Sequence, residues 1–301
     1  MCESLRQSFG YRNSAPRRFA VAAEGCTRTA RDRVTRQVAD RSRGGLMAAG
    51  VPRTALVTGG SRGIGRAVVE RLGSVGTVVA VHYGHDAAAA DRAVAGVRAA
   101  GGRAFPVRAE LGAPSAVDEL ARGVEEGLRL HTGATGLDIL VNNAGIGCRA
   151  DIDSLTREQL DRALEINVKV PVFLTQRLLP LMRDGGRIVN ISSVAPRVAH
   201  PHVLGYAMTK GALEAFSRSL AAQVGPRGIT VNTVAPGLIE TDLHRDRLRA
   251  HPEEAEEAAA LTMFGRIGQA DDVAGVVAFL ASAQSRWITG QRVEATGGAY
   301  L

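Results

Sequence analysis

The chain has 301 residues, of which 45% are hydrophobic and 22% are charged, which suits one large α/β domain or two smaller domains. The formal net charge is +7, but residues 1–46 hold ten arginines against four acidic residues, and the remaining 255 residues carry a net charge of only +1. A folded part at +1 has no basic surface for a phosphate backbone, so we expect no nucleic-acid partner.

The longest strongly apolar stretch, residues 274–283, has about half of the ~20 residues that cross a bilayer, so we expect no membrane-spanning helix. The three cysteines, Cys2, Cys26 and Cys148, form neither a disulfide framework nor the Cys-x-x-Cys spacing of a metal site. We therefore expect a cytoplasmic protein without a metal.

The first 46 residues show no sustained hydrophobic period and no apolar run of signal-peptide length. We expect either a disordered basic tail or sequence upstream of a misplaced start, because Met47 stands directly before the ordered pattern begins. An arginine-rich, acid-poor leader is also typical of a transit peptide. The expected division is therefore a tail at residues 1–46 and one domain at residues 47–301.

From residue 53 onward, short runs rich in β-branched residues alternate with segments of helical length. The runs predict strands at residues 54–58, 77–82, 104–107, 137–142, 187–192, 229–234 and 292–295, and the segments predict helices at 64–75, 87–100, 115–131, 157–182, 204–224 and 271–282. Strands that alternate with crossover helices form a parallel sheet covered on both faces. We predict a single doubly wound Rossmann-type α/β domain with a seven-stranded parallel sheet, whose ligands bind at the carboxyl ends of the strands.

A glycine-rich loop follows the first predicted strand and leads into a helix. Gly59, Gly63 and Gly65 permit a tight turn, a close approach of backbone to ligand, and close packing of the helix on the strand. The helix N-terminus directs free N–H groups and the positive end of its dipole at an anion. The loop therefore predicts a dinucleotide site with contacts from Gly59, Ser61, Arg62, Gly63, Ile64 and Gly65.

The end of the second predicted strand bears on the choice of cofactor. It reads Val81-His82-Tyr83-Gly84 and lacks the acidic residue that binds the ribose hydroxyls of NAD. Arg62 places a cation in the glycine loop, where a 2′-phosphate would bind. We therefore expect NADPH/NADP rather than NADH, with Tyr83 among the cofactor contacts. Asp86 is expected to cap the next helix.

A tyrosine and a lysine stand four residues apart in the helix predicted at residues 204–224. Tyr206 and Lys210 therefore share one helix face, and the chain has only four tyrosines and two lysines, so the pair is rare by chance. A tyrosine, with an ordinary pKa near 10, is a poor acid at neutral pH, and a nearby ammonium lowers that pKa by stabilising the phenolate. Ser193 follows the strand predicted at residues 187–192, at the carboxyl edge of the sheet.

These motifs, with Asn142-Asn143-Ala144-Gly145, Asn167 and Pro236-Gly237, resemble those of the short-chain dehydrogenase/reductase family in kind and order. The resemblance covers residues 53–301 and is closest to the 3-oxoacyl-[acyl-carrier-protein] reductase branch. It implies that Tyr206 is the general acid, that Lys210 also binds the nicotinamide ribose, and that Ser193 holds the substrate oxygen. It further implies that Asn167 fixes a water that relays protons to Lys210, the alternative being a purely structural buried asparagine.

The resemblance also implies cofactor contacts beyond the glycine loop. They come from Glu110, Leu111, Asn143, Ala144, Gly145, Tyr206, Lys210, Pro236, Gly237, Ile239 and Thr241. Glu110 departs from the family pattern, in which Asp or Asn commonly contacts the adenine. Cys148 has no base placed to activate it and is expected to be passive. His200 and His202 are expected at the pocket rim, and no metal-ligand spacing includes them.

The sequence thus predicts NADPH-dependent reduction of a ketone, a 3-oxoacyl thioester or a similar carbonyl, to a secondary alcohol, with Tyr206 as general acid. The alternative is an NAD(P)-dependent alcohol or sugar dehydrogenase that works in the oxidative direction. A catalytically silent nucleotide sensor is disfavoured because it would not need the acid–base set. The substrate is expected to be a small molecule or carrier-bound, and residues 237–268 are expected to form a lid. In this lid Arg245, Arg247 and Arg249 could meet an acidic carrier protein or a phosphopantetheine, although the positive field is largely cancelled by Glu253, Glu254, Glu256 and Glu257.

Apolar residues on the two long predicted helices indicate a partner surface, because one apolar stripe suffices to cover the sheet. They are Leu174, Leu178, Leu179 and Leu181 on the helix at 157–182, and Leu213, Phe216 and Leu220 on the helix at 204–224. Together with the resemblance, they predict a homotetramer or homodimer.

Overall fold

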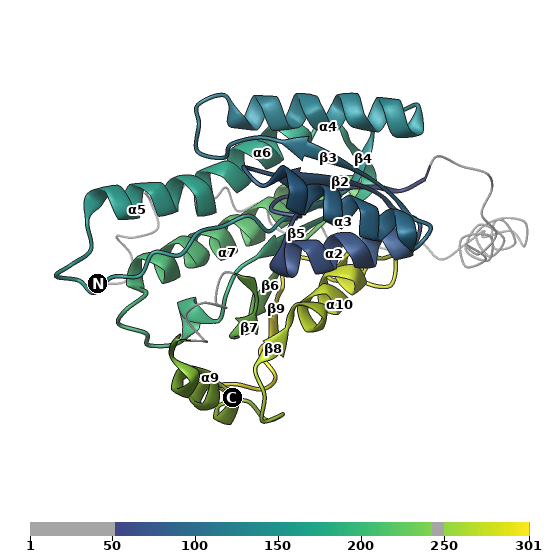
Figure 1. Ribbon diagram of the computed structural model, residues 1–301. Helices are drawn as coiled ribbons and strands as arrows, with labels where there is room; N and C mark the ends of the chain where they lie inside the picture. Colours follow the sequence, from purple (N-terminus) through teal and green to yellow (C-terminus); the bar gives the residue numbers. More distant parts are fainter. Residues whose placement is uncertain (1–51, 243–249, 301) are drawn as a thin grey trace, which may run out of the picture. The chain divides into compact units, whose positions relative to one another are not determined.

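The computed structural model describes residues 52–242 and 250–300 (Figure 1). The tail predicted at residues 1–46 lies outside the described residues, and so do Arg245, Arg247 and Arg249. Within the described part, no helix is long and apolar enough to cross a membrane.

Seven parallel strands form one sheet in the order β3-β2-β1-β4-β5-β6-β9. They are β1 (Thr54–Val57), β2 (Val78–Tyr83), β3 (Arg103–Arg108), β4 (Leu137–Asn142), β5 (Met182–Ile191), β6 (Thr230–Pro236) and β9 (Arg292–Ala295). In register, Leu56 of β1 lies between Ala80 of β2 and Leu140 of β4. The strand order reverses at β1 and β4, which is where a doubly wound sheet binds its ligand. The predicted fold class is confirmed.

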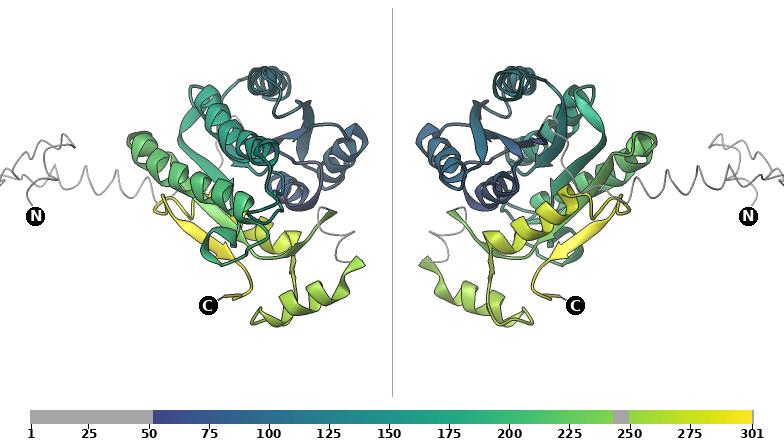
Figure 2. Two further views of the ribbon diagram at one scale, coloured as in Figure 1. Left: turned by 90° about the vertical axis from the view of Figure 1, so that its left-hand side faces the viewer. Right: turned by 90° about the vertical axis from the view of Figure 1, so that its right-hand side faces the viewer.

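Helices cover both faces of this sheet (Figure 2). One face carries α2 (Gly63–Ser74), α3 (Ala87–Ala99) and α10 (Ala270–Ala281), and the other carries α4 (Ala116–Thr132), α6 (Val170–Leu178) and α7 (Leu204–Val224). Alternate strand residues enter the two cores, so that Ala55 and Val57 pack under α2 while Leu56 packs under the opposite layer. The strands are apolar on both sides because both faces are buried.

The single helix predicted at residues 157–182 is wrong. The structure divides it into α5 (Arg157–Leu164), a π-helical turn η1 (Glu165–Lys169) and α6, and Met182 already begins β5. Pro171 has no N–H for the carbonyl four residues earlier, and the turn before it widens, with the N–H of Val170 bonded to the carbonyl of Glu165. α6 ends at Leu178, two residues before Pro180, which has no N–H to continue the helical hydrogen bonds.

Among the described residues between β6 and α10, three short elements were not predicted. Residues Ile239–Glu240 (β7) pair in parallel with Gly268–Gln269 (β8), and the helix α9 (Pro252–Ala260) lies between them. The two-residue pairing brings the ends of the predicted lid together beside the carboxyl end of β6.

The leucines that predicted a partner surface lie mostly in the core of this chain. Leu174, Leu178 and Leu213 are 1% exposed or less, and Leu220 is also buried. Leu179 and Leu181 lie beyond the end of α6 and, like Phe216, pack against the same core. These side chains are therefore needed to cover the sheet and supply no surplus apolar face, so the oligomeric state stays a prediction.

Candidate active site

The loop between β1 and α2 is held in a shape that only glycine permits. A Cβ atom at Gly65 would lie 2.1 Å from the carbonyl oxygen of Gly59, and Gly59 itself has φ +63°. A side chain at Gly65 would therefore collide with backbone that cannot move aside. The loop passes over the carboxyl end of β1, as the sequence predicts.

The first turn of α2 has no side-chain cap. Its N-cap residue Arg62 makes no capping hydrogen bond, and the turn contains no acidic residue. Free N–H groups at a helix N-terminus, with the positive end of the dipole, bind an anion such as a pyrophosphate. The observed geometry thus fits the phosphates of a dinucleotide.

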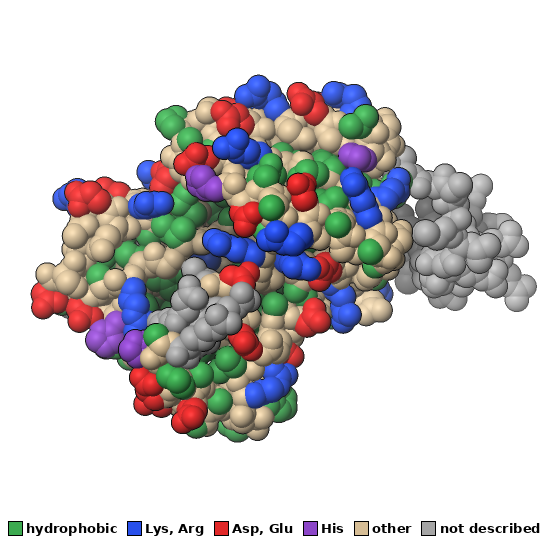
Figure 3. Space-filling view, viewed as in Figure 1, with side chains coloured by type: hydrophobic (Ala, Val, Ile, Leu, Met, Phe, Trp, Pro, Cys, Tyr) green, Lys and Arg blue, Asp and Glu red, His purple; other side chains and the backbone are tan. Residues whose placement is uncertain are grey.

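An open pocket of ≈ 790 Å³ lies in front of this turn and is lined by Ser61, Arg62, Gly63 and Thr241 among others. Arg66 and Arg92 also line it, and Figure 3 shows basic side chains gathered over the start of α2 and α3. Arg66 is paired with Glu70 at 2.8 Å, whereas Arg62 has no partner among the described residues and is exposed. Arg62, like the exposed Arg92, is therefore a cation of this pocket that is available to a phosphate.

The turn after β4 is bonded to the glycine loop. Thr58 Oγ1 accepts the N–H groups of Asn143 (2.9 Å) and Ala144 (3.0 Å), and Asn143 Nδ2 donates to the carbonyl oxygen of Thr58 at 2.8 Å. The structure thus brings Asn143, Ala144 and the glycine loop together at the point where the strand order reverses.

His82 is a site residue that the sequence reasoning missed. The N–H of Gly59 donates to His82 Nδ1 at 2.9 Å, and His82 Nε2 bonds to the carbonyl oxygen of Ala109 at 3.1 Å. The side chain is 3% exposed, and burial lowers its pKa from 6.5 to about 4. The signal in the sequence was a histidine at the end of an otherwise apolar strand, the strand predicted directly after the glycine loop and its helix.

The predicted acid–base residues meet at the carboxyl ends of β5 and β6. Tyr206 and Lys210 share a face of α7, with Lys210 Nζ 5.7 Å from the centroid of the Tyr206 ring. Ser193 follows β5, and its side chain lies near enough to Tyr206 to affect the pKa of the phenol. The structure therefore brings Ser193, Tyr206 and Lys210 together.

The expected lowering of the Tyr206 pKa by Lys210 is not what the structure gives. Burial raises the pKa of Tyr206, and the hydrogen bond with Ser193 offsets part of that effect. Burial also lowers the pKa of Lys210 from 10.5 to about 8. Desolvation penalises both charged forms, so the phenol is protonated at neutral pH.

Lys210 and Asn167 lie on either side of the turn after β4. Lys210 Nζ donates to the carbonyl oxygen of Ile191 at 2.8 Å. Asn167 accepts the N–H of Ile146 and donates to its carbonyl oxygen, both at 2.9 Å, and also donates to Thr209 Oγ1 at 3.1 Å. The Asn167 side chain thus fixes the turn, and its role toward a water stays a prediction.

The remaining predicted cofactor residues are divided between the two ends of the site. Pro236 ends β6 and accepts the N–H of Val194 at 2.9 Å, and Gly237 and Ile239 line a second hollow of ≈ 230 Å³. Tyr83 ends β2 and is half-buried. Two predicted residues follow β3: Leu111, which is partly buried, and Glu110, whose exposed side chain pairs with His85 at 3.3 Å.

The remaining side chains named from the sequence are a cysteine, two histidines and the aspartate predicted to cap a helix. Cys148 is buried, and burial raises the pKa of its thiol, in agreement with a passive cysteine. His200 Nε2 lies 3.2 Å from the Tyr300 hydroxyl, and His202 Nδ1 lies 2.5 Å from Asp151 Oδ1. Asp86 caps α3 by accepting the N–H of Ala89 at 2.8 Å, as predicted.

Proteins of known sequence and structure match most of the described chain. A family model described as Enoyl-(Acyl carrier protein) reductase matches residues 59–300. Versicolorin reductase 1 of Aspergillus parasiticus is 37% identical over 258 residues, which cover 82% of this chain and 96% of that protein.

Two solved structures are similar over nearly their whole length. LugOII, described as a promiscuous reductase that catalyses keto-reduction at C1 during lugdunomycin biosynthesis, is 50% identical, has a TM-score of 0.80, and matches over 83% of this chain and 99% of its own. The angucycline C-6 ketoreductase LanV, solved with bound NADP, is 48% identical, has a TM-score of 0.79, and matches over 82% of this chain and 96% of its own.

These matches settle the family but leave its branch open. The family model is named for a carrier-protein reductase, whereas LugOII and LanV are described by keto-reduction, so the expected 3-oxoacyl branch stays a prediction. The structure brings the tyrosine–lysine pair and Ser193 together, and their catalytic roles stay a prediction. The chain belongs to the short-chain dehydrogenase/reductase family and is an oxidoreductase that acts on carbonyl or hydroxyl groups.

Proposed function

We propose that this protein uses NADPH to reduce a ketone to a secondary alcohol, with Tyr206 as the proton donor. The observation that carries the proposal is the meeting of Ser193, Tyr206 and Lys210 at the carboxyl edge of the sheet, beside an uncapped helix N-terminus with Arg62 at its start. LanV was solved with NADP, and LugOII is described by keto-reduction.

The glycine loop and α2 would hold the cofactor. The pyrophosphate would bind the free N–H groups of the first turn, which the missing Cβ atoms of Gly59 and Gly65 leave open to close approach. Arg62 would pair with the 2′-phosphate, and no carboxylate on β2 competes for it. The bound nicotinamide supplies the hydride.

Tyr206 provides the proton that the reduced oxygen needs. Its raised pKa keeps the phenol protonated at neutral pH, which is the form that a general acid requires. Ser193, whose side chain lies near Tyr206, would hold the carbonyl oxygen through its hydroxyl. Lys210, with a pKa of about 8, is mostly an ammonium at neutral pH, and its Nζ lies 5.7 Å from the centroid of the Tyr206 ring, so its charge would attract the phenolate. Lys210 therefore stabilises Tyr206 after the proton has left.

The substrate that we propose is a bulky ketone of the angucycline kind rather than a simple thioester. Met263 and Phe264 are 70% and 74% exposed, and Phe264 lines the hollow beside Gly237. The N–H of Met263 donates to the carbonyl oxygen of Gly297 at 2.8 Å, which fixes this apolar edge beside the end of the sheet. Exposed apolar surface at a site edge favours a large apolar ligand.

The test is the rate of NADPH oxidation by the purified protein with an angucycline ketone and, separately, with an acetoacetyl thioester. We expect turnover with the first and a kcat/KM lower by at least about tenfold with the second. Tyr206→Phe should lower kcat by roughly 10²–10⁴-fold while NADPH binding stays intact, because only one hydroxyl is lost. Equal turnover by wild type and Tyr206→Phe would contradict the assignment of the acid. Alcohol oxidation without ketone reduction would contradict the direction.

A further inference from the structure

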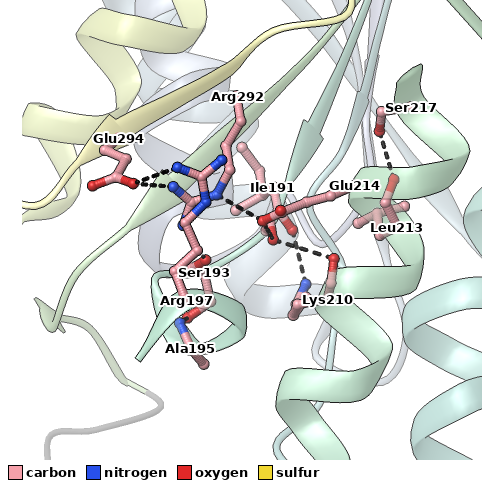
Figure 4. A network of polar contacts seen from close by, with 11 residues as sticks. Ile191, Ser193, Ala195, Arg197, Lys210, Leu213, Glu214, Ser217, Arg292 and Glu294 are labelled. Carbon is pink, nitrogen blue, oxygen red and sulfur yellow. Dashed lines mark hydrogen bonds and ion pairs between the residues drawn. The ribbon is translucent and has the colours of Figure 1, made fainter. Parts of the chain in front are cut away.

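An ion pair is buried directly behind the acid–base residues. Arg292 of β9 and Glu214 of α7 are 2.8 Å apart, and their side chains are only 5% and 8% exposed. Among the ion pairs of the described residues, it alone has both side chains so deeply buried. Figure 4 shows Arg292 lying between Glu214 and Glu294.

The pair contacts both segments that carry the catalytic groups. Glu214 stands one helical turn after Lys210, and its Oε1 also accepts the hydroxyl of Ser192 at 2.8 Å. Arg292 donates from its second terminal nitrogen to the carbonyl oxygen of Ser193 at 3.1 Å. One guanidinium therefore links the β5 end that presents Ser193 to the helix that presents Tyr206 and Lys210.

A second branch of the network reaches the far side of Ser193. Arg292 also pairs with Glu294, and Glu294 Oε1 lies 3.6 Å from the guanidinium of Arg197. Arg197 ends the short helical turn that begins at Ala195, whose N–H donates to Ser193 Oγ at 3.2 Å. The serine is thus held at its carbonyl by Arg292 and at its hydroxyl by a turn tied to the same network.

Stability alone does not account for this arrangement. Burying two charges costs several kcal/mol per ion, and apolar residues of similar volume commonly serve a fold as well or better. A planar guanidinium with several fixed donors is, however, suited to holding three groups at set directions. The pair therefore serves to fix the relative positions of the groups that Arg292 contacts, Glu214, Glu294 and the carbonyl oxygen of Ser193.

We propose that Arg292 and Glu214 are positioning residues of the reaction, which keep Ser193 and the α7 face of Tyr206 and Lys210 in their mutual alignment. The role rests on the proposed function, because Ser193, Tyr206 and Lys210 are the groups that it aligns. Neither Arg292 nor Glu214 acts on the substrate itself.

The first test is Arg292→Lys. The lysine keeps a positive charge against Glu214, but its single nitrogen cannot also reach the carbonyl oxygen of Ser193. We expect kcat to fall by about tenfold or more, with the KM for NADPH within about twofold and the melting temperature within a few degrees of wild type. An unchanged kcat would overturn the proposal.

The matched control is Arg183→Lys. Arg183 pairs with Asp138 at 2.6 Å and is partly buried. It lies near the start of β5, the strand whose other end leads to Ser193. We expect its kcat to equal that of wild type. Similar losses of kcat in the two lysine variants would show a general effect of weakened packing and overturn the proposal.

A second readout needs no substrate. Since the chain has only two lysines, Lys169 and Lys210, a protein labelled with ¹⁵N-lysine reports on Lys210 directly, and exposed Lys169 serves as an internal reference. Glu214→Gln should shift the Lys210 ammonium signal and leave the Lys169 signal in place. Superimposable spectra would overturn the positioning role. If wild type reduces no ketone, the proposed function fails, and this spectrum still decides whether the network sets the environment of Lys210.

Discussion

His82 Nδ1 accepts the backbone N–H of Gly59 at 2.9 Å, which joins the end of β2 to the loop that would hold the cofactor phosphates. Because Nδ1 is an acceptor here, the ring proton is on Nε2, which donates to the carbonyl oxygen of Ala109 at 3.1 Å. Both bonds require the neutral imidazole. A second proton would place a donor against the N–H of Gly59.

This arrangement predicts a loss of stability in mild acid. The folded pKa of His82 is about 4, below the value of 6.5 in an unfolded chain. The unfolded state therefore binds the proton first, and stability is lost as pH falls from 6.5 toward 4. We expect the free energy of unfolding to fall by roughly 2 kcal/mol from this group between about pH 7 and pH 4.5, measured by urea denaturation.

His82→Asn should remove that part of the pH dependence, because asparagine does not titrate. His85→Asn is the control, since His85 is 76% exposed and lies outside the loop contact. Equal slopes of stability against pH for His82→Asn and wild type would contradict the prediction.

Arg62 should set the preference for NADPH over NADH. Arg62→Ala removes a partner that only the 2′-phosphate possesses, so we expect the Kd for NADPH to rise by roughly 10- to 100-fold and that for NADH to change little. Adding Tyr83→Asp should move the preference further toward NADH, because the new carboxylate repels the phosphate and accepts the ribose hydroxyls. Arg71→Ala, at the other end of α2, controls for loss of charge. Tighter binding of NADH than NADPH by wild type would contradict the assignment.

Most of the fold was predictable because each element carries its own signal. The bounds of β4, α7 and β9 agree with the sequence patterns to the residue, since each begins or ends where the apolar pattern stops. The helix predicted at residues 157–182 failed because its apolar residues continue past the π-helical turn. Pro171 and Pro180 were the signals that should have divided it.

The polar contacts within the site were not predictable in the same way. Glu214 and Arg292 are 78 positions apart, and no local pattern joins them. His82 stands out as a histidine in an apolar strand, but only the packing of the sheet shows that it contacts Gly59, 23 positions earlier. Motif spacing identifies residues that touch along one helix, as with Tyr206 and Lys210, but partners on different strands are set by the packing of the whole sheet.

The turn after β4 should be sensitive to a single added methyl group. A Cβ at Gly145 would lie 3.1 Å from Asn167 Oδ1 and 3.4 Å from Lys210 Nζ, so the Asn167 amide would have to move by a few tenths of an ångström while Lys210 Nζ would be in ordinary contact. We expect Gly145→Ala to lower kcat by roughly tenfold, since small displacements of a catalytic group are costly. Gly147→Ala, in the same turn, is the control, because its Cβ would meet nothing within 4 Å. Equal steady-state rates for the two variants would contradict the expected contact.

Lys210 should make the protein less stable at neutral pH than at alkaline pH. Its folded pKa of about 8 lies below the 10.5 of an exposed lysine, so between these values the unfolded chain binds a proton that the folded chain does not. Stability therefore rises with pH across this window.

Lys210→Met removes the titrating group but also leaves the carbonyl oxygen of Ile191 without its donor, so the prediction concerns the slope and not the absolute stability. The free energy of unfolding of wild type minus that of Lys210→Met should increase by roughly 2 kcal/mol between about pH 7.5 and pH 9.5. Lys169→Met, at an exposed lysine, should run parallel to wild type. Parallel curves for wild type and Lys210→Met would mean that the buried ammonium is not destabilised. The expected divergence of the two curves would instead mean that the buried ammonium lowers the stability of the fold at neutral pH, as is common for catalytic groups with shifted pKa values.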